Sequence, residues 1–240
     1  MKSFIILMSI WGVVLALIII NLFTNPASFF VNGTIILGWF LFAIQLTWNQ
    51  SERFYMFIKK LWFNMINPEC VWNMEVSYQG DFDRDIFDVL DKTFLERGEN
   101  QKIISVSNMR KIYKLDTLSF EISVDEYSST IQLSLQDLEV SYRRSKKIIE
   151  EELGQLLEEI NKKIKADNTH YSLIIQFNEF NPYYGFFIRR LNAKDIQTFN
   201  VKFNIESDKV SIGKKRIEIN TTTLQKLTTF SKEYLTLSPR

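Results

Sequence analysis

Two long apolar runs dominate the pattern of residues at the start of the chain. Phe4 to Phe23 contains no charged residue, and neither does Ala27 to Trp48. Each run is close to the ~20 residues that a helix needs to cross the ~30 Å hydrocarbon core of a bilayer. Pro26 lies between the runs, where its ring interrupts helical hydrogen bonding. The pattern therefore predicts a two-helix transmembrane hairpin over residues 1–50.

Basic residues flank this predicted hairpin at one end only. Lys2 precedes the first run, and Arg53, Lys59 and Lys60 follow the second, whereas the loop at 21–34 has no Lys or Arg. Because basic residues favour the cytoplasmic side of short loops, we expect both chain ends in the cytoplasm. The first run is also longer than the apolar core of a signal peptide. These features predict a two-pass protein of a bacterial inner membrane.

Residues 51–68 show an amphipathic pattern at helical spacing, which ends at Asn67–Pro68. Such a juxtamembrane helix either lies among the headgroups of an anionic leaflet or continues the second span as a stalk against the next domain. The residues expected at the membrane interface are aromatic or basic, namely Trp48, Arg53, Lys59, Lys60 and Trp62.

Residues 69–240 alternate between strand and helix patterns. Amphipathic helices are predicted over 81–95, 145–165 and 221–235. The links between most successive strands are too short for parallel crossovers, so the fold class is predicted as α+β, with a mainly antiparallel sheet in one cytosolic domain. The predicted strands cover 71–78, 103–106, 112–115, 118–124, 130–142, 171–178, 185–191, 199–205, 209–212 and 216–219.

A short identity points to an internal repeat. The tetrapeptide Glu-Val-Ser-Tyr occurs at 75–78, before the first predicted helix of this domain, and again at 139–142, before the second. Each of these helices is followed by several strands. One interpretation is a duplicated β-α-β-β-β unit, and the other is a single α+β domain in which the identity arose by chance.

The balance of acidic and basic residues argues against nucleic acid as a general binding partner. The chain has 29 basic and 28 acidic residues, and Lys2 is the one charged residue before position 51. Residues 51–240 therefore carry no net charge, whereas a general nucleic-acid binder has a basic excess. The single cysteine, Cys70, cannot form an internal disulfide, which is typical of a reducing compartment.

The sequence lacks the usual catalytic and metal-binding motifs. One histidine, His170, and one cysteine cannot make the usual zinc ligand sets. No G-x-S-x-G elbow marks a serine nucleophile, and the glycines outside the apolar runs are too scattered for a phosphate-binding loop. We therefore expect a protein without catalytic activity, metal or cofactor.

A basic cluster surrounds the predicted start of the long helix at 145–165. The free N–H groups at such a helix start, together with four cations, favour a phosphate-bearing ligand or an acidic partner. The alternative is a solvated helix face that the acidic run at 150–152 compensates. The cluster consists of Arg143, Arg144, Lys146 and Lys147.

Two further binding candidates lie late in the chain, a basic hairpin and a turn with adjacent tyrosines. Tyrosines beside arginines can stack on and neutralise a nucleotide or anchor a protein partner, although tyrosines at strand starts are also ordinary core residues. The residues are Lys214, Lys215 and Arg216 in the hairpin, and Tyr183, Tyr184, Arg189 and Arg190 at the turn and after it.

The order of a membrane hairpin and a larger cytosolic domain resembles that of two-transmembrane effectors in bacterial anti-phage defence systems. This resemblance of domain order implies a non-enzymatic effector or sensor. Its cytosolic domain would bind a protein partner or an anionic ligand such as a nucleotide, and would control oligomerisation of the hairpin and permeabilisation of the membrane. The alternative is a membrane-tethered scaffold or assembly partner without pore activity. Both functions involve the lipid bilayer and a homo-oligomer.

Overall fold

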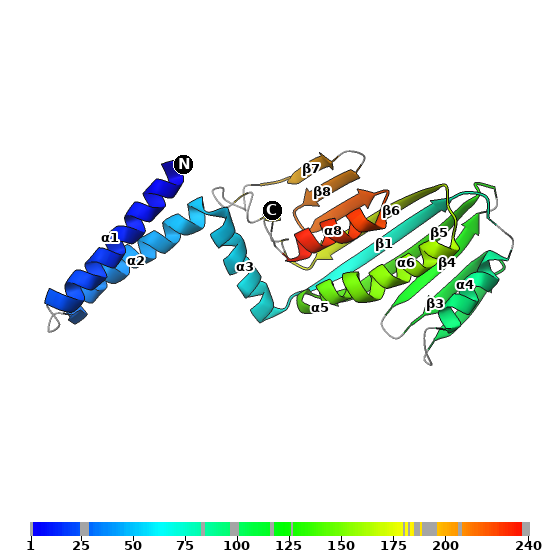
Figure 1. The fold of residues 1–240 in the computed structure, drawn as a ribbon, viewed down its shortest axis with the longest axis horizontal. Coiled ribbons are helices and arrows are strands. Elements are labelled where there is room, and N and C mark those ends of the chain that lie inside the picture. The colour runs from blue at the N-terminus through cyan, green and yellow to red at the C-terminus, as the bar shows by residue number, and fades with distance from the viewer. Residues whose placement is uncertain are drawn as a thin grey trace.

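The structure is a computed structural model, and it describes residues 2–24, 29–82, 85–96, 101–115, 118–125, 127–179, 181, 183–184, 188, 196–205 and 208–236. Three N-terminal helices precede a large sheet that is accompanied by further helices (Figure 1). The helices are α1 (Lys2–Thr24), α2 (Phe29–Gln50), α3 (Glu52–Ile66), α4 (Ile86–Leu95), α5 (Tyr142–Lys147), the π-helix η2 (Ile148–Leu153), α6 (Gly154–Lys163) and α8 (Leu224–Thr236). The strands are β1 (Glu69–Gln79), β2 (Lys102–Ser107), β3 (Arg110–Lys114), β4 (Ser119–Asp125), β5 (Thr130–Ser141), β6 (Asn168–Phe177), β7 (Asn200–Ile205), β8 (Asp208–Gly213) and β9 (Arg216–Thr221).

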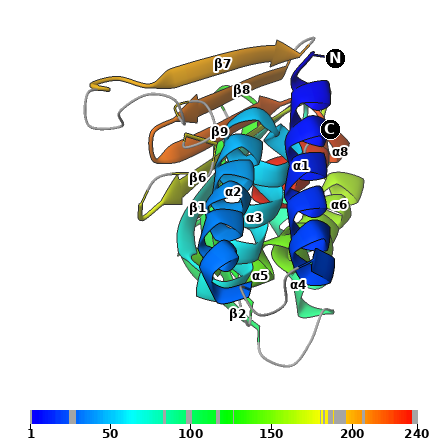
Figure 2. The ribbon, with the colours of Figure 1, turned by 90° about the vertical axis from the view of Figure 1, so that its left-hand side faces the viewer.

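Helices α1 and α2 cover the two apolar runs and lie side by side (Figures 1 and 2). Val14 and Ala43 are buried, and the Trp11 indole N–H donates a hydrogen bond of 3.0 Å to the Thr47 hydroxyl. The Trp11 ring also meets the Phe40 ring edge-on at 5.8 Å. The two apolar runs thus form a helical hairpin.

This hairpin does not meet the requirements for a membrane crossing. Within the described residues, no helix is both long enough and apolar enough to span a bilayer. The last turns of α2 contain the polar residues Gln45, Asn49 and Gln50. The predicted transmembrane hairpin, and with it the two-pass inner-membrane location, is therefore wrong.

Helix α3 occupies the segment with the amphipathic pattern and has a defined cap at each end. The Ser51 hydroxyl accepts a hydrogen bond of 3.3 Å from the Phe54 N–H, which satisfies one free donor of the first turn. Asn67 ends the helix in the left-handed region, at φ 51°, and donates its N–H to the Phe63 carbonyl at 2.8 Å. The helix therefore ends at the predicted Asn67–Pro68 boundary.

Across the described residues, one antiparallel sheet of nine strands forms the main layer, in the order β2-β3-β4-β5-β1-β6-β9-β8-β7. The long strand β1 lies near its centre and pairs with β5 on one side and β6 on the other. Within the described residues, every strand pair is antiparallel. The predicted α+β class with an antiparallel sheet is thus confirmed.

The helices α4, α5–η2–α6 and α8 pack against the sheet and against one another (Figure 1). Alternate residues of β1, such as Trp72, Val76 and Tyr78, are buried in the core between these layers, together with Leu156 and Leu157 of α6. The intervening residues of β1 are partly or fully exposed. One face of the sheet is therefore covered and carries the core, while the other is open to solvent.

Two sequence predictions change in this part of the chain. Helix α4 begins at Ile86, five residues after the predicted helix start at position 81. Within the predicted strand at 185–191, the one described residue, Ile188, is helical, and the others lie outside the described residues. The predicted internal repeat can be compared with the order of the strands. Each half of the sheet contains three consecutive antiparallel strands that begin at the sheet edge, β2-β3-β4 in one half and β7-β8-β9 in the other, but the second half also contains β6. The duplicated unit stays a prediction.

Candidate functional site

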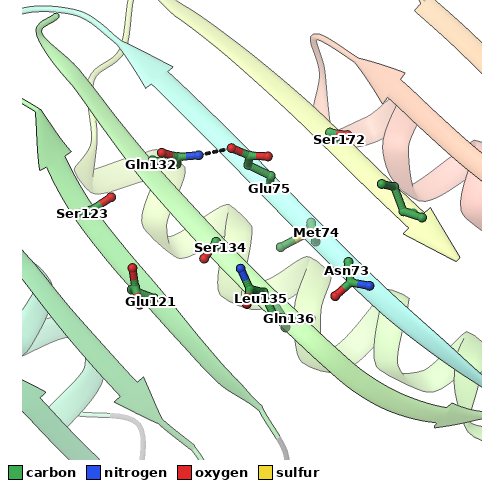
Figure 3. A pocket seen from close by; sticks show the side chains of 11 residues that line it. Asn73, Met74, Glu75, Glu121, Ser123, Gln132, Ser134, Leu135, Gln136 and Ser172 are labelled. Carbon is green, nitrogen blue, oxygen red and sulfur yellow. Dashed lines mark hydrogen bonds between the residues drawn. The ribbon is translucent and has the colours of Figure 1, made fainter. Parts of the chain in front are cut away.

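The open face of the sheet carries a polar groove over its four central strands (Figure 3). The groove has a volume of about 380 Å³ and belongs to β4, β5, β1 and β6. Hydroxyl, amide and carboxylate side chains form most of its lining, and no aromatic side chain of the described residues takes part. The lining residues are Asn73, Met74, Glu75, Glu121, Ser123, Gln132, Ser134, Leu135, Gln136, Ser172 and Ile174.

The strand register explains why the sheet is hollowed here. Ser134 of β5 lies directly opposite Glu121 of β4 on one side and Glu75 of β1 on the other. Ser172 of β6 follows on the far side of Glu75. Because serine side chains are short, they leave a depression between the longer carboxylates, which form its walls. With neighbouring strands ~4.8 Å apart, the backbones of the two glutamates lie about 10 Å from each other.

A β-bulge bends the sheet at one end of the groove. The register between β1 and β5 shifts between Trp72 and Met74, so that β5 contains an extra residue at this point. Asp137 lies in the bulge and has a left-handed backbone conformation, with φ 52°. Its N–H donates a hydrogen bond of 2.8 Å to the Asn73 side-chain oxygen. The bulge therefore fixes Asn73 and the end of the groove in place.

The two groove carboxylates differ in their partners. The Arg110 guanidinium of β3 donates two hydrogen bonds to the Glu121 oxygens, each of 2.7 Å. Glu121 in turn raises the pKa of Arg110, first through the side-chain hydrogen bond and then through its charge. Glu75 accepts a hydrogen bond from the Gln132 side-chain amide instead (Figure 3). Within the described residues no cation pairs with Glu75, so it supplies the uncompensated charge of the groove.

The basic cluster at the start of the long helix lies away from this groove. The Arg143 guanidinium donates to the Asn64 carbonyl at the end of α3, at 2.8 Å from Nε, and its backbone N–H donates to Asn67. Arg144 pairs with Glu152 at 3.8 Å. Lys146 and Lys147 are exposed. Arg143 therefore joins α3 to α5, and the acidic run compensates part of the cluster.

The basic hairpin and the tyrosine turn, which are separate in sequence, meet in the structure. The Asn181 side chain donates to the Gly213 carbonyl and accepts from the Tyr184 N–H. The Lys214 ammonium lies 5.8 Å from the centre of the Tyr184 ring, and the Lys215 ammonium donates to the Asn178 carbonyl at 3.1 Å.

Burial limits what this second cluster can bind. Tyr184 is 1% exposed and packs edge-on against Phe199, and Tyr183 is 9% exposed. Neither ring offers an open face to a nucleotide base. Arg216 lies 3.9 Å from Glu218, and Arg189 and Arg190 lie outside the described residues.

The residues predicted for a membrane interface have varied surroundings. The Trp48 ring packs against the Tyr55 ring at 4.7 Å, and the Lys59 ammonium lies 5.8 Å from the same ring. Partial burial lowers the pKa of Lys59, against the raising effect of the Glu179 charge. Arg53, Lys60 and Trp62 are exposed.

Sequence reasoning missed the groove. The sequence predicts the strands that form it. In these strands, polar residues such as Glu75, Glu121 and Ser134 alternate with apolar ones. These residues become neighbours across the sheet only through the strand order β4-β5-β1-β6. The sequence does not show this order, because it joins strands that are far apart along the chain. The signal that could have found them is the run of short serines facing longer carboxylates on the predicted solvent side.

Comparisons with known proteins add no family to this picture. No protein-family model matches the chain, and no relative was found among curated proteins. Within the described residues, no group of His, Cys, Asp and Glu side chains is placed to hold a metal ion.

Proposed function

We propose that the protein is a non-catalytic binding protein, and that the open face of its sheet receives a protein partner. The observation that carries this proposal is the polar groove, a hollow of about 380 Å³ on the uncovered side of the sheet. Binding sites are concave, and a few placed polar groups in them fix the orientation of what binds. The partner would place one or more side chains in this hollow and cover the polar face around it.

The chemistry of the groove favours a protein partner over an anionic ligand. Its two charged groups, Glu75 and Glu121, are carboxylates that repel phosphate. A nucleotide base or a sugar ring would find no aromatic side chain for stacking in the lining. Serine hydroxyls and side-chain amides, in contrast, can both donate and accept hydrogen bonds with a peptide.

This proposal keeps one part of the function expected from sequence. The effector function depended on two membrane spans, which the structure contradicts, and so did the role of the lipid bilayer as a partner. Binding of a protein partner, as in a scaffold or assembly protein, does not depend on them. A homo-oligomer also stays a prediction.

Filling the groove tests the proposal. Full-length protein would be screened against an array of random capped dodecapeptides, as wild type and as Ser134→Trp, in which the indole occupies the floor of the groove. The matched control is Lys209→Trp, since Lys209 is exposed on β8, outside the groove lining. We expect a set of peptides that bind the wild type and the control but lose at least tenfold in affinity for Ser134→Trp.

Two results would contradict the proposal. One is that no peptide binds the wild type. The other is that the peptides that bind are equally affected by the substitutions at 134 and 209. Circular dichroism of both variants would show whether the tryptophan substitutions leave the fold intact, and Ser134→Gln is the smaller substitution to use if they do not.

A further inference from the structure

One wall residue of the groove, Glu121, already binds an arginine, Arg110 of the neighbouring strand β3. Arg110 approaches Glu121 with its guanidinium fork and donates from both Nε and an Nη to the two carboxylate oxygens, each at 2.7 Å. Paired hydrogen bonds of this kind are the strong, geometrically specific form of an arginine–carboxylate contact. The contact is made on an exposed surface, since the Arg110 side chain is 52% exposed.

Glu75 occupies the corresponding position on the other side of Ser134. Both glutamates are register partners of the same serine, one on β1 and the other on β4. Glu121 has an arginine from its own chain, whereas Glu75 has the neutral amide of Gln132. Within the part of the chain that the structure describes, the second wall of the groove therefore lacks the cation that the first wall has.

We propose that Glu75 binds the guanidinium of an arginine from the protein partner, with Arg110 as the intramolecular equivalent on the opposite wall. This inference rests on the proposed function, because it names the side chain that the groove would receive. The hydroxyls of Ser134 and Ser172 lie beside Glu75 in the register and can accept the remaining guanidinium N–H groups.

Arginine fits this position better than lysine. A guanidinium has five N–H donors in a flat fork and satisfies a carboxylate and a neighbouring hydroxyl at once, whereas an ammonium is a compact point charge. The groove lies on an open sheet face, where solvent weakens a simple charge attraction. Paired hydrogen bonds, rather than charge alone, therefore set the preference.

The ligand side of the test uses the peptide with the highest affinity for the wild type in the array. The peptide is resynthesised with each arginine replaced in turn by citrulline, which keeps the shape of the side chain but removes its charge, and by lysine. We expect one arginine whose change to citrulline weakens binding at least tenfold, with lysine intermediate.

The protein side of the test uses isosteric changes. Glu75→Gln is expected to reduce the affinity for the arginine peptide about tenfold and to leave the affinity for the citrulline peptide unchanged. The matched control is Glu139→Gln, which removes an exposed charge from β5 outside the groove lining. Arg110→Gln frees the Glu121 carboxylate, so it is expected to strengthen binding of the arginine peptide.

The outcomes separate this inference from the proposed function. A groove that binds no peptide overturns both. Peptides that lose affinity for Ser134→Trp but contain no essential arginine, or bind Glu75→Gln as well as the wild type, overturn the inference and leave the proposed function standing. An equal loss in Glu75→Gln and Glu139→Gln also overturns it, because the effect would then be general electrostatics.

Discussion

Asp208 and Lys226 form an ion pair between the start of β8 and the first turn of α8. The Lys226 ammonium lies 2.8 Å from the carboxylate, and the Asp208 side chain is fully buried. Burial acts to raise the pKa of Asp208, but the Lys226 ammonium beside the carboxylate outweighs it, so the pKa lies below its ordinary value. The pair therefore joins the sheet to α8 only while Asp208 is ionised.

This lowered pKa gives the folded protein a dependence on pH in the acid range. A carboxyl with a lower pKa in the folded state stabilises the fold fully above its unfolded pKa of ~3.9, and the contribution is lost as the pH falls through the folded pKa. Asp208→Asn should cost about 2 kcal/mol of unfolding free energy at pH 7 and flatten the fall below about pH 4. Urea denaturation of wild type and variant from pH 3 to 7 measures both effects. Parallel stability curves would contradict this account.

At the scale of single residues, the sequence identified side chains that could bind a ligand, but it did not show which residues surround them. Arg143 was interpreted as part of either an anion site or a solvated helix face, and its guanidinium donates instead to the Asn64 carbonyl. Tyr184 was interpreted either as a stacking residue for a ligand or as an ordinary core residue, and the structure buries it beside Phe199. In both cases the sequence left the choice open, because the contacts that decide it join segments distant in sequence.

The long helix after β5 contains an irregular segment that its sequence pattern conceals. Residues 148–153 form the π-helix η2 between α5 and α6, and the Gly154 N–H donates to the Ile149 carbonyl, five residues earlier. A Cβ atom at position 154 would lie 2.6 Å from that carbonyl oxygen. Glycine is thus required here for the close approach of two backbone segments.

Gly154→Ala should therefore destabilise the protein, although the same change normally stabilises a helix by about 1 kcal/mol. Relief of the contact with the Ile149 carbonyl requires a shift of η2, whose residues Ile149 and Leu153 are buried in the core, at a cost of about 1–3 kcal/mol. Urea denaturation checks the sign, with Gln155→Ala as an exposed control on the same helix that should change stability little. Increased stability of Gly154→Ala would show that η2 adapts without cost.

At the scale of elements, the hydrophobic periodicity predicted whether a segment is a strand or a helix, but it did not predict where a helix is irregular. Alternation located β1, β4, β5 and β9 within a few residues, since one face of each strand is buried and the other is not. The apolar spacing predicts one continuous helix over 145–165. The π-helix η2 interrupts it, but the apolar residues of η2 are still buried, so the pattern is unchanged. The six-residue departure of the helix from regular geometry leaves no mark in the apolar spacing.

At the scale of the whole molecule, the sequence could not show how the strands combine. The central pair β1–β5 joins residues more than 50 positions apart, as the contact between Glu75 and Gln132 shows. That pairing, its bulge at Asp137 and the adjoining β4 and β6 create the groove. The hairpin shows the opposite error, since apolar runs of adequate length predicted membrane spans that the described helices do not support.

The central claim is that the groove on the open sheet face is the binding site, and chemical-shift mapping tests it most directly. Backbone amide spectra of the full-length ¹⁵N-labelled protein would be recorded during titration with the capped peptide of highest affinity. The account predicts the largest shifts around Glu75, Glu121, Ser134 and Ser172, with little change in α6 or α8. Shifts concentrated on the helical face, on the N-terminal helices or on the hairpin at 213–216 would contradict it.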